Sequence, residues 1–186
     1  MKSPFKNTLT ASLLLLALNA SPCGAALNAY LRITGETQGE IQGGVTQAGR
    51  EGSIECISFE HTVVSPRDAA SGLPTGKRQH TPIKLTMPID KATPLIANAW
   101  SNNENLTEVT LRFYRPDATG TEQQYYTISL QNARVSSIRT WKPNTRDPES
   151  IALPDMVEVQ LVYQRIIWTW EDGGITAEDD WETPVN

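Results

Sequence analysis

Apolar and polar residues alternate along most of the chain after residue 26, and this pattern constrains the fold more than any other feature. Successive side chains of a strand point to opposite faces, so the alternation indicates strands that bury one face and expose the other. Four segments show it, with apolar residues at Ala29, Leu31 and Ile33, at Ile83, Leu85 and Met87, at Val109, Leu111 and Phe113, and at Tyr126, Ile128 and Leu130. The chain is therefore predicted to be mainly β.

The alternation changes phase near the C-terminus. Apolar side chains occupy odd positions over residues 157–163 and even positions over residues 166–170. A one-residue slip turns every side chain to the other face, so we expect a bulge or sharp bend near Gln164 and Arg165. A strand that is buried on both faces is the alternative explanation.

Only one segment is typical of a helix. Thr93 suits its N-cap, Asp90 is a second candidate cap, and Pro94 suits the first turn. Asn102 and Asn103 are expected to end it. The apolar face is predicted to hold Leu95, Ile96, Ala99 and Trp100. One short helix and about nine strands predict an antiparallel β-sandwich or barrel with the helix packed on its side.

The first 26 residues have the composition of a signal peptide. Lys2 and Lys6 precede an apolar run over residues 9–18, and small residues follow around Cys23. A membrane-spanning helix needs about 20 apolar residues, so we expect no stable membrane insertion. Residues 27–186 are predicted to form a single domain.

Charge is concentrated at the C-terminus. Without residues 1–26, which hold two lysines and no acid, 14 basic and 21 acidic residues remain, a net charge of −7. Six carboxylates lie in the last sixteen residues, which hold no Lys or Arg: Glu171, Asp172, Glu178, Asp179, Asp180 and Glu182. This acidic C-terminal tail is either solvated or a docking segment. Without a basic face, nucleic acid is not an expected partner.

No group of residues indicates catalysis. His61 and His80 have no metal-binding companion three or four residues away, and no serine lies in a Gly-x-Ser-x-Gly elbow. With Cys23 in the leader, Cys56 has no disulfide partner and is expected to be buried. We therefore predict that the protein is not an enzyme and has no catalytic, metal-binding or cofactor-binding residues.

Five segments in order resemble a known family, over roughly residues 28–182. They are Arg50-Glu51-Gly52-Ser53-Ile54-Glu55 with Glu60-His61, Thr75-Gly76-Lys77-Arg78-Gln79-His80-Thr81-Pro82, Pro88-Ile89-Asp90-Lys91-Ala92-Thr93-Pro94-Leu95, Glu122-Gln123-Gln124-Tyr125-Tyr126 and Ile167-Trp168-Thr169-Trp170-Glu171-Asp172-Gly173. Together they resemble the haemolysin-coregulated proteins, the tube subunits of bacterial type VI secretion.

The resemblance implies hexameric rings that stack into a tube, which a contracting sheath propels out of the cell. It also implies a spike and small effector proteins, carried in the pore, as partners. Members of the family assemble in the cytoplasm and become extracellular through the secretion machine. A genuine signal peptide would instead place assembly in the periplasm, so the leader departs from the family pattern.

Two connections, residues 65–80 and 141–153, are long enough to suggest a function. The resemblance implies that the first is an arm that reaches a neighbouring subunit or ring. Its basic side chains complement the acidic tail, and a tryptophan outside regular structure is often a contact residue. The predicted subunit contacts are Arg67, Lys77, Arg78, His80 and Trp181.

The alternative function is a secreted or periplasmic β-sandwich that binds or cleaves carbohydrate. The signal peptide favours it, as do Trp141 and Trp181, which are expected to lie in a loop and in the tail. The lack of a catalytic group and the five-segment resemblance oppose it.

Overall fold

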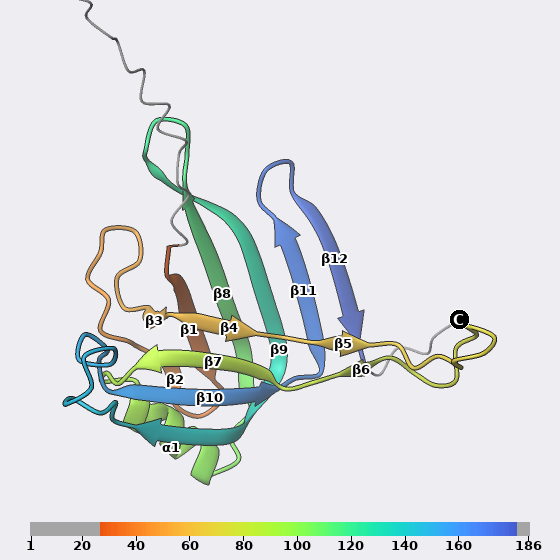
Figure 1. The fold of residues 1–186 in the computed structure, drawn as a ribbon, viewed down its shortest axis with the longest axis horizontal. Coiled ribbons are helices and arrows are strands. Elements are labelled where there is room, and N and C mark those ends of the chain that lie inside the picture. Colours follow the sequence, from red (N-terminus) through yellow and green to blue (C-terminus); the bar gives the residue numbers. More distant parts are fainter. Residues whose placement is uncertain (1–26, 182–186) are drawn as a thin grey trace, which may run out of the picture.

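A computed structural model describes residues 27–181, which form twelve strands and one helix (Figure 1). The elements are β1 (Ala29–Gly35), β2 (Gly39–Ile41), β3 (Ile54–Cys56), β4 (Ser58–Glu60), β5 (Val63–Val64), β6 (Gln79–His80), β7 (Ile83–Pro88), α1 (Thr93–Ser101), β8 (Leu106–Pro116), β9 (Glu122–Trp141), β10 (Met156–Val162), β11 (Arg165–Trp170) and β12 (Ile175–Asp180). The prediction of a mainly β, antiparallel fold with one short helix is confirmed.

Ten of the twelve described strands form two packed layers that share β9, and β5 and β6 form a separate two-stranded sheet. Hydrogen-bonded order runs β2-β1-β8-β9-β10-β7-β4, with β3 beside β1 and with β11 and β12 continuing from β9. The first part of β9 pairs with β8 and β11, whereas residues 134–141 pair with β10. Asn132, with a φ of 50°, lies where the partners change. Asparagine tolerates this left-handed conformation, which allows the long strand to turn from one layer into the other.

The predicted bend near Gln164 is confirmed. β10 pairs with β7 and β9 in one layer, and β11 pairs with β9 and β12 in the other. Tyr163 and Gln164 lie between the two strands. The phase of the alternation therefore changes because the chain passes from one layer to the other.

The segment from β3 to β4 joins the layers on their other side. β3 pairs with β1 and β4 with β7, and the Ile57 N–H between them donates to the Thr86 carbonyl at 3.0 Å. The core lies between the layers and includes the predicted inward residues Leu31, Ile33, Leu85, Met87, Leu111 and Leu130. The alternation thus identified the buried face of β1, β7, β8 and the first part of β9, whereas Trp170 of β11, on the predicted apolar face, is 36% exposed.

One face of α1 was predicted too broadly. Ile96 and Ala99 are buried, but Leu95 is 40% exposed and Trp100 is 49% exposed. Successive helix residues are rotated by about 100°. Leu95 and Trp100 therefore lie roughly 70° to either side of the centre of the buried stripe, which Ile96 and Ala99 form. A nine-residue helix on a sheet covers only a narrow stripe, so the prediction of a core position is wrong for Leu95 and Trp100.

Candidate functional site

The long connection after β5 is an ordered hairpin, which we call the arm (residues 63–80). β5 pairs with β6 at its base, and Arg67 and Pro74 form an isolated bridge further out. The Thr75 N–H donates to the Pro66 carbonyl at 3.0 Å between these points. The arm extends from the body at one end of the longest dimension (Figure 1).

The arm tip (residues 67–74) is closed by its own hydrogen bonds. Oδ1 of Asp68 accepts the N–H groups of Ala70 and Ser71 at 3.2 and 2.7 Å and the Ser71 hydroxyl at 2.7 Å. Hydrogen bonds from Ser71 lower the pKa of Asp68, so the carboxylate stays charged and holds the turn. Leu73 is left 65% exposed.

Five side chains attach the arm to the body, and we call them the anchor cluster. The Tyr163 hydroxyl lies 2.7 Å from Nε2 of His61 and 2.7 Å from Nδ1 of His80. Nε2 of His80 lies 2.8 Å from Oδ2 of Asp179, whose two oxygens also accept hydrogen bonds from Arg78. The His80 side chain is only 3% exposed. The cluster therefore connects the arm to β12 through partly buried polar groups.

Donors and acceptors around the Tyr163 hydroxyl can be arranged in two ways. Because Nε2 of His80 faces the Asp179 carboxylate, this nitrogen carries a proton and donates it. When His80 is neutral, the Tyr163 hydroxyl donates to its Nδ1 and His61 donates to the Tyr163 oxygen. When His80 is charged, both donations reverse. The three hydrogen bonds that join His61, Tyr163, His80 and Asp179 are thus formed in either arrangement.

Burial and neighbouring charges set the ionisation of the cluster. Burial lowers the pKa of His61, and the nearby His80 lowers it further. Burial and the charge of Asp179 raise the pKa of Tyr163. Burial alone would raise the pKa of Asp179, but hydrogen bonds from Arg78 and His80 outweigh it and lower that pKa. At neutral pH the cluster therefore holds a charged carboxylate, a neutral phenol and a neutral His61.

Two tryptophans border the anchor cluster. The Trp168 ring is stacked beside both histidines, with centroids 6.4 Å from those of His61 and His80. Trp181 lies 5.1 Å from His80 by ring centroids and is 48% exposed. Trp141, predicted to lie in a loop, is the last residue of β9 instead.

Residues 175–180 of the acidic tail form the strand β12, so the interpretation of a free, solvated terminus is wrong for them, while the docking role stays a prediction. All six residues of β12 pair with β11. Glu178 forms an ion pair with Arg165, and Asp179 forms one with Arg78. Glu182 lies outside the described residues, as does the predicted signal peptide over residues 1–26.

The predicted contact residues occupy two different environments. Arg78 and His80 bind Asp179 of the same chain, so arm and tail complement each other within one subunit. Arg67 and Lys77 are exposed on the arm, and Nη1 of Arg67 donates to the Gly72 carbonyl at 3.1 Å. Sequence reasoning missed Tyr163, because its alternation indicated only a buried strand residue.

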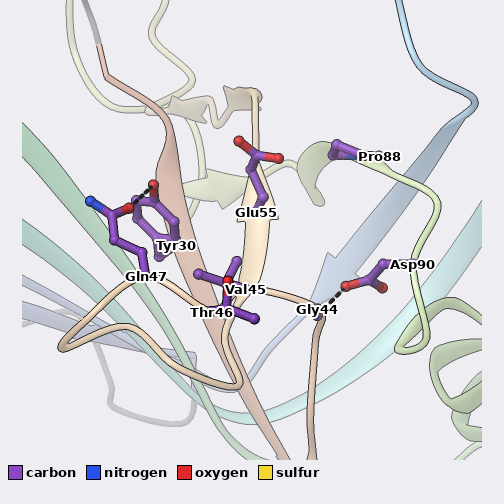
Figure 2. A pocket seen from close by; sticks show the side chains of 8 residues that line it. All are labelled: Tyr30, Gly44, Val45, Thr46, Gln47, Glu55, Pro88 and Asp90. Carbon is purple, nitrogen blue, oxygen red and sulfur yellow. Dashed lines mark hydrogen bonds between the residues drawn. The ribbon is translucent and has the colours of Figure 1, made fainter.

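A cavity of about 380 Å³ lies beside the β2–β3 loop, at the end of β7 that is farther from the arm (Figure 2). Asp90 shapes one wall: its Oδ2 accepts the Gly44 N–H at 2.8 Å and its Oδ1 accepts the Ala92 N–H at 2.8 Å. Thr93, predicted to cap α1, instead accepts the Asp90 N–H through its hydroxyl at 3.1 Å. The cavity is lined by Tyr30, Gly44, Val45, Thr46, Gln47, Glu55, Pro88 and Asp90.

Arg50 holds the loop between β2 and β3 that borders this cavity. Its guanidinium carbon lies 4.6 Å from the Tyr30 ring centroid and 3.6 Å from that of Tyr114. Its Nη2 lies 2.6 Å from Oε2 of Glu122, and the residue is 7% exposed. This contact packs the loop against the hairpin of β8 and β9, and no pattern in the sequence indicated it.

The described part of the chain has neither a candidate metal site nor a helix suited to crossing a membrane. Residues 27–181 contain no group of three or more His, Cys, Asp or Glu side chains placed to hold a metal ion. No helix among them is both long and apolar enough to cross a membrane. Cys56 is 2% exposed, as predicted, and burial raises the pKa of its thiol to about 12.

Comparisons with known proteins agree with the resemblance. Residues 30–170 match the family model described as "Type VI secretion system effector, Hcp". The "Major exported protein" of Pseudomonas aeruginosa is 38% identical over 169 residues, covering 86% of this chain and 98% of that protein. No comparison favours the carbohydrate-binding alternative.

Solved structures give the same result. The "Crystal structure of Hcp protein" aligns with a TM-score of 0.79 at 28% identity, covering 86% of this chain and all of that one. The "Secreted protein Hcp3 from Pseudomonas aeruginosa" aligns with a TM-score of 0.70 at 30% identity, over 86% of this chain and 100% of its own. The chain therefore belongs to the haemolysin-coregulated protein (Hcp) family and is a tube subunit of a type VI secretion system.

Proposed function

We propose that this protein forms hexameric rings that stack into the inner tube of a type VI secretion system and leave the cell with it. The observation that carries the proposal is the ordered arm, which extends from a compact two-layer body (Figure 1). A ring needs a heterologous interface, in which one surface of a subunit meets a different surface of the next. An arm at one end of the subunit can supply the first surface.

The proposed residue roles follow from the two environments on the arm. Arg67 and Lys77 contact a neighbouring subunit, and Trp181, which is 48% exposed, extends that contact. Arg78 and His80 position the arm by binding Asp179. All five residues thus serve the interface: three contact the neighbouring subunit directly, and Arg78 and His80 fix the position of the arm.

The family also suggests the remaining partners. The sheath of the secretion machine would surround the tube, and the spike would precede it. Small effector proteins would travel in the lumen of the tube. The protein acts as a structural subunit without catalysis, and residues 27–186 act as one domain. Assembly takes place in the cytoplasm, or in the periplasm if residues 1–26 direct export.

Assembly in solution tests this function. Sedimentation and electron microscopy of residues 27–186 should reveal rings with six times the subunit mass. A stable monomer at micromolar concentration would refute the proposal.

Removing the arm tip tests the role of the arm. Deleting residues 67–74 keeps β5, β6 and the anchor cluster, so the fold should remain while subunit or ring contacts weaken. Deleting residues 144–151, an equally long part of the connection between β9 and β10, is the matched control. Unchanged assembly of the arm deletion would mean that the arm is only a loop.

A further inference from the structure

We propose that the cavity beside the β2–β3 loop receives the arm tip of a second copy of this chain. This inference rests on the proposed function, because it requires neighbouring subunits. It adds the acceptor surface that the arm would contact.

The arm and the cavity lie at opposite ends of β7. The arm leads through Thr81 and Pro82 into β7, whose last residue, Pro88, lines the cavity. Six strand residues span about 20 Å, and the arm points away from that end (Figure 1). A subunit therefore offers its arm on one side and its cavity on the other, which is the arrangement of a head-to-tail contact.

The surfaces of the cavity and the arm tip are chemically complementary. The cavity combines apolar surface from Val45 and Pro88 with the carboxylates of Glu55 and Asp90, and no basic side chain lines it (Figure 2). The arm tip presents Leu73, which is 65% exposed. Apolar surface would thus meet Leu73.

Two basic side chains of the arm would meet the carboxylates. Within residues 27–181, neither Arg67 nor Lys77 forms an ion pair. The arm therefore offers unpaired cations and the cavity offers carboxylates, which favours a contact between arm and cavity. A contact between two arms would instead bring like charges together.

Both surfaces are already ordered in the single subunit. Asp68 closes the arm tip through the Ser71 N–H at 2.7 Å. On the cavity side, Asp90 holds Gly44 at 2.8 Å, and the Tyr30 hydroxyl donates to Gln47 at 2.9 Å. Little conformational freedom would be lost on docking, which favours association of preformed surfaces.

Engineered cysteines test the contact. The substitutions Leu73→Cys and Thr46→Cys, introduced together in a Cys23→Ser background, place one thiol on the arm tip and one on the cavity rim. Cys56 remains, since burial raises the pKa of its thiol to about 12 and keeps it unreactive. Mild oxidation should join successive chains into a ladder of covalent oligomers on a non-reducing gel.

The matched control pairs Leu73→Cys with Ile175→Cys, because Ile175 is 68% exposed and lies on β12, which pairs with β11 and contributes no residue to the cavity lining. Disulfide formation should be at least about tenfold faster for the cavity pair, since docked surfaces face each other at millimolar effective concentration. Equal rates, or no ladder from an assembled protein, would overturn the acceptor site.

A charge exchange gives an independent result. Arg67→Glu and Glu55→Arg should each weaken assembly by about tenfold, and the double variant should restore it. Sedimentation of the parent protein separates the two proposals. A monomeric parent refutes both, whereas an assembled parent without rescue or cross-linking refutes only the arm-tip site.

Discussion

Nε2 of His80 lies 2.8 Å from Oδ2 of Asp179, although 99 residues separate them in the chain. This contact joins the end of the arm to the edge strand β12. The position of the arm, and with it any surface that the arm presents to a neighbour, therefore depends on the last strand of the fold.

Replacing Asp179 with asparagine should loosen the arm while keeping the fold. The variant loses a carboxylate that binds both Arg78 and His80, and a hydrogen bond to a charged group contributes about 1.5–3 kcal/mol. We expect faster proteolysis within the arm and a comparable decrease in the free energy of unfolding. Glu178→Gln, which removes a more exposed ion pair to Arg165, should change stability by less than about 1 kcal/mol. Equal effects of the two variants would contradict a special role of the anchor cluster.

Acid should destabilise the protein partly through His61. Burial lowers its pKa in the folded state below the ordinary value of 6.5, so the unfolded chain binds this proton first. The contribution to stability is complete above pH 6.5 and is lost as the pH falls below it toward the folded-state pKa. Urea unfolding from about pH 8 to about pH 5 measures it.

The control for this measurement is His61→Gln, which can still hydrogen-bond Tyr163 but does not titrate. Its unfolding free energy should fall less than that of the parent over the same pH range. Identical pH profiles would show that His61 does not contribute.

Deleting residues 175–186 should destabilise the subunit itself. The deletion removes β12, six residues that all pair with β11, and it also removes Asp179 from the anchor cluster. We expect Tm to fall by about 5–10 °C, which corresponds to a few kcal/mol for a chain of this size. Deleting only residues 182–186, which leaves β12 complete, is the control. Equal Tm values for the longer deletion and the parent would show that residues 175–186 do not stabilise the subunit.

Replacing Arg50 with lysine should release the β2–β3 loop. Lysine keeps the charge but loses the planar group that packs on Tyr30 and Tyr114 and pairs with Glu122. We expect a loss of about 1–3 kcal/mol in unfolding free energy. Arg32→Lys, at an exposed pair with Glu40, should cost less than about 1 kcal/mol. Hydrogen exchange of the loop would reveal whether its opening accompanies the loss.

Local patterns predicted the strands well and the surroundings of the helix poorly. Alternation at Leu31, Ile33 and Leu85 identified core positions, because a strand in a two-layer fold has one buried face. Trp100 was misplaced since the width of the buried stripe on a helix depends on the surface against which it packs. That surface is formed by β9, which follows α1 in the chain.

Charge composition misled the interpretation of the C-terminus. Six carboxylates without a basic residue suggested either a solvated tail or a docking segment, and neither interpretation included a strand. Strand pairing uses backbone groups and tolerates charged side chains at an edge. The hydrogen bonds that make Ile175–Asp180 a strand are formed with β11, so they appear only when both strands are placed.

The sequence by itself determined the strand periodicity, the bend after Tyr163 and the long connection that becomes the arm, because these depend on neighbours along the chain. Only the tertiary structure decided which charges meet. Arg78 reaches Asp179 across 101 residues and Arg50 packs on Tyr114, and such contacts depend on how strands pair across the sheets. The sequence shows which side chains are charged, whereas the pairing of strands in the fold decides which of these side chains meet.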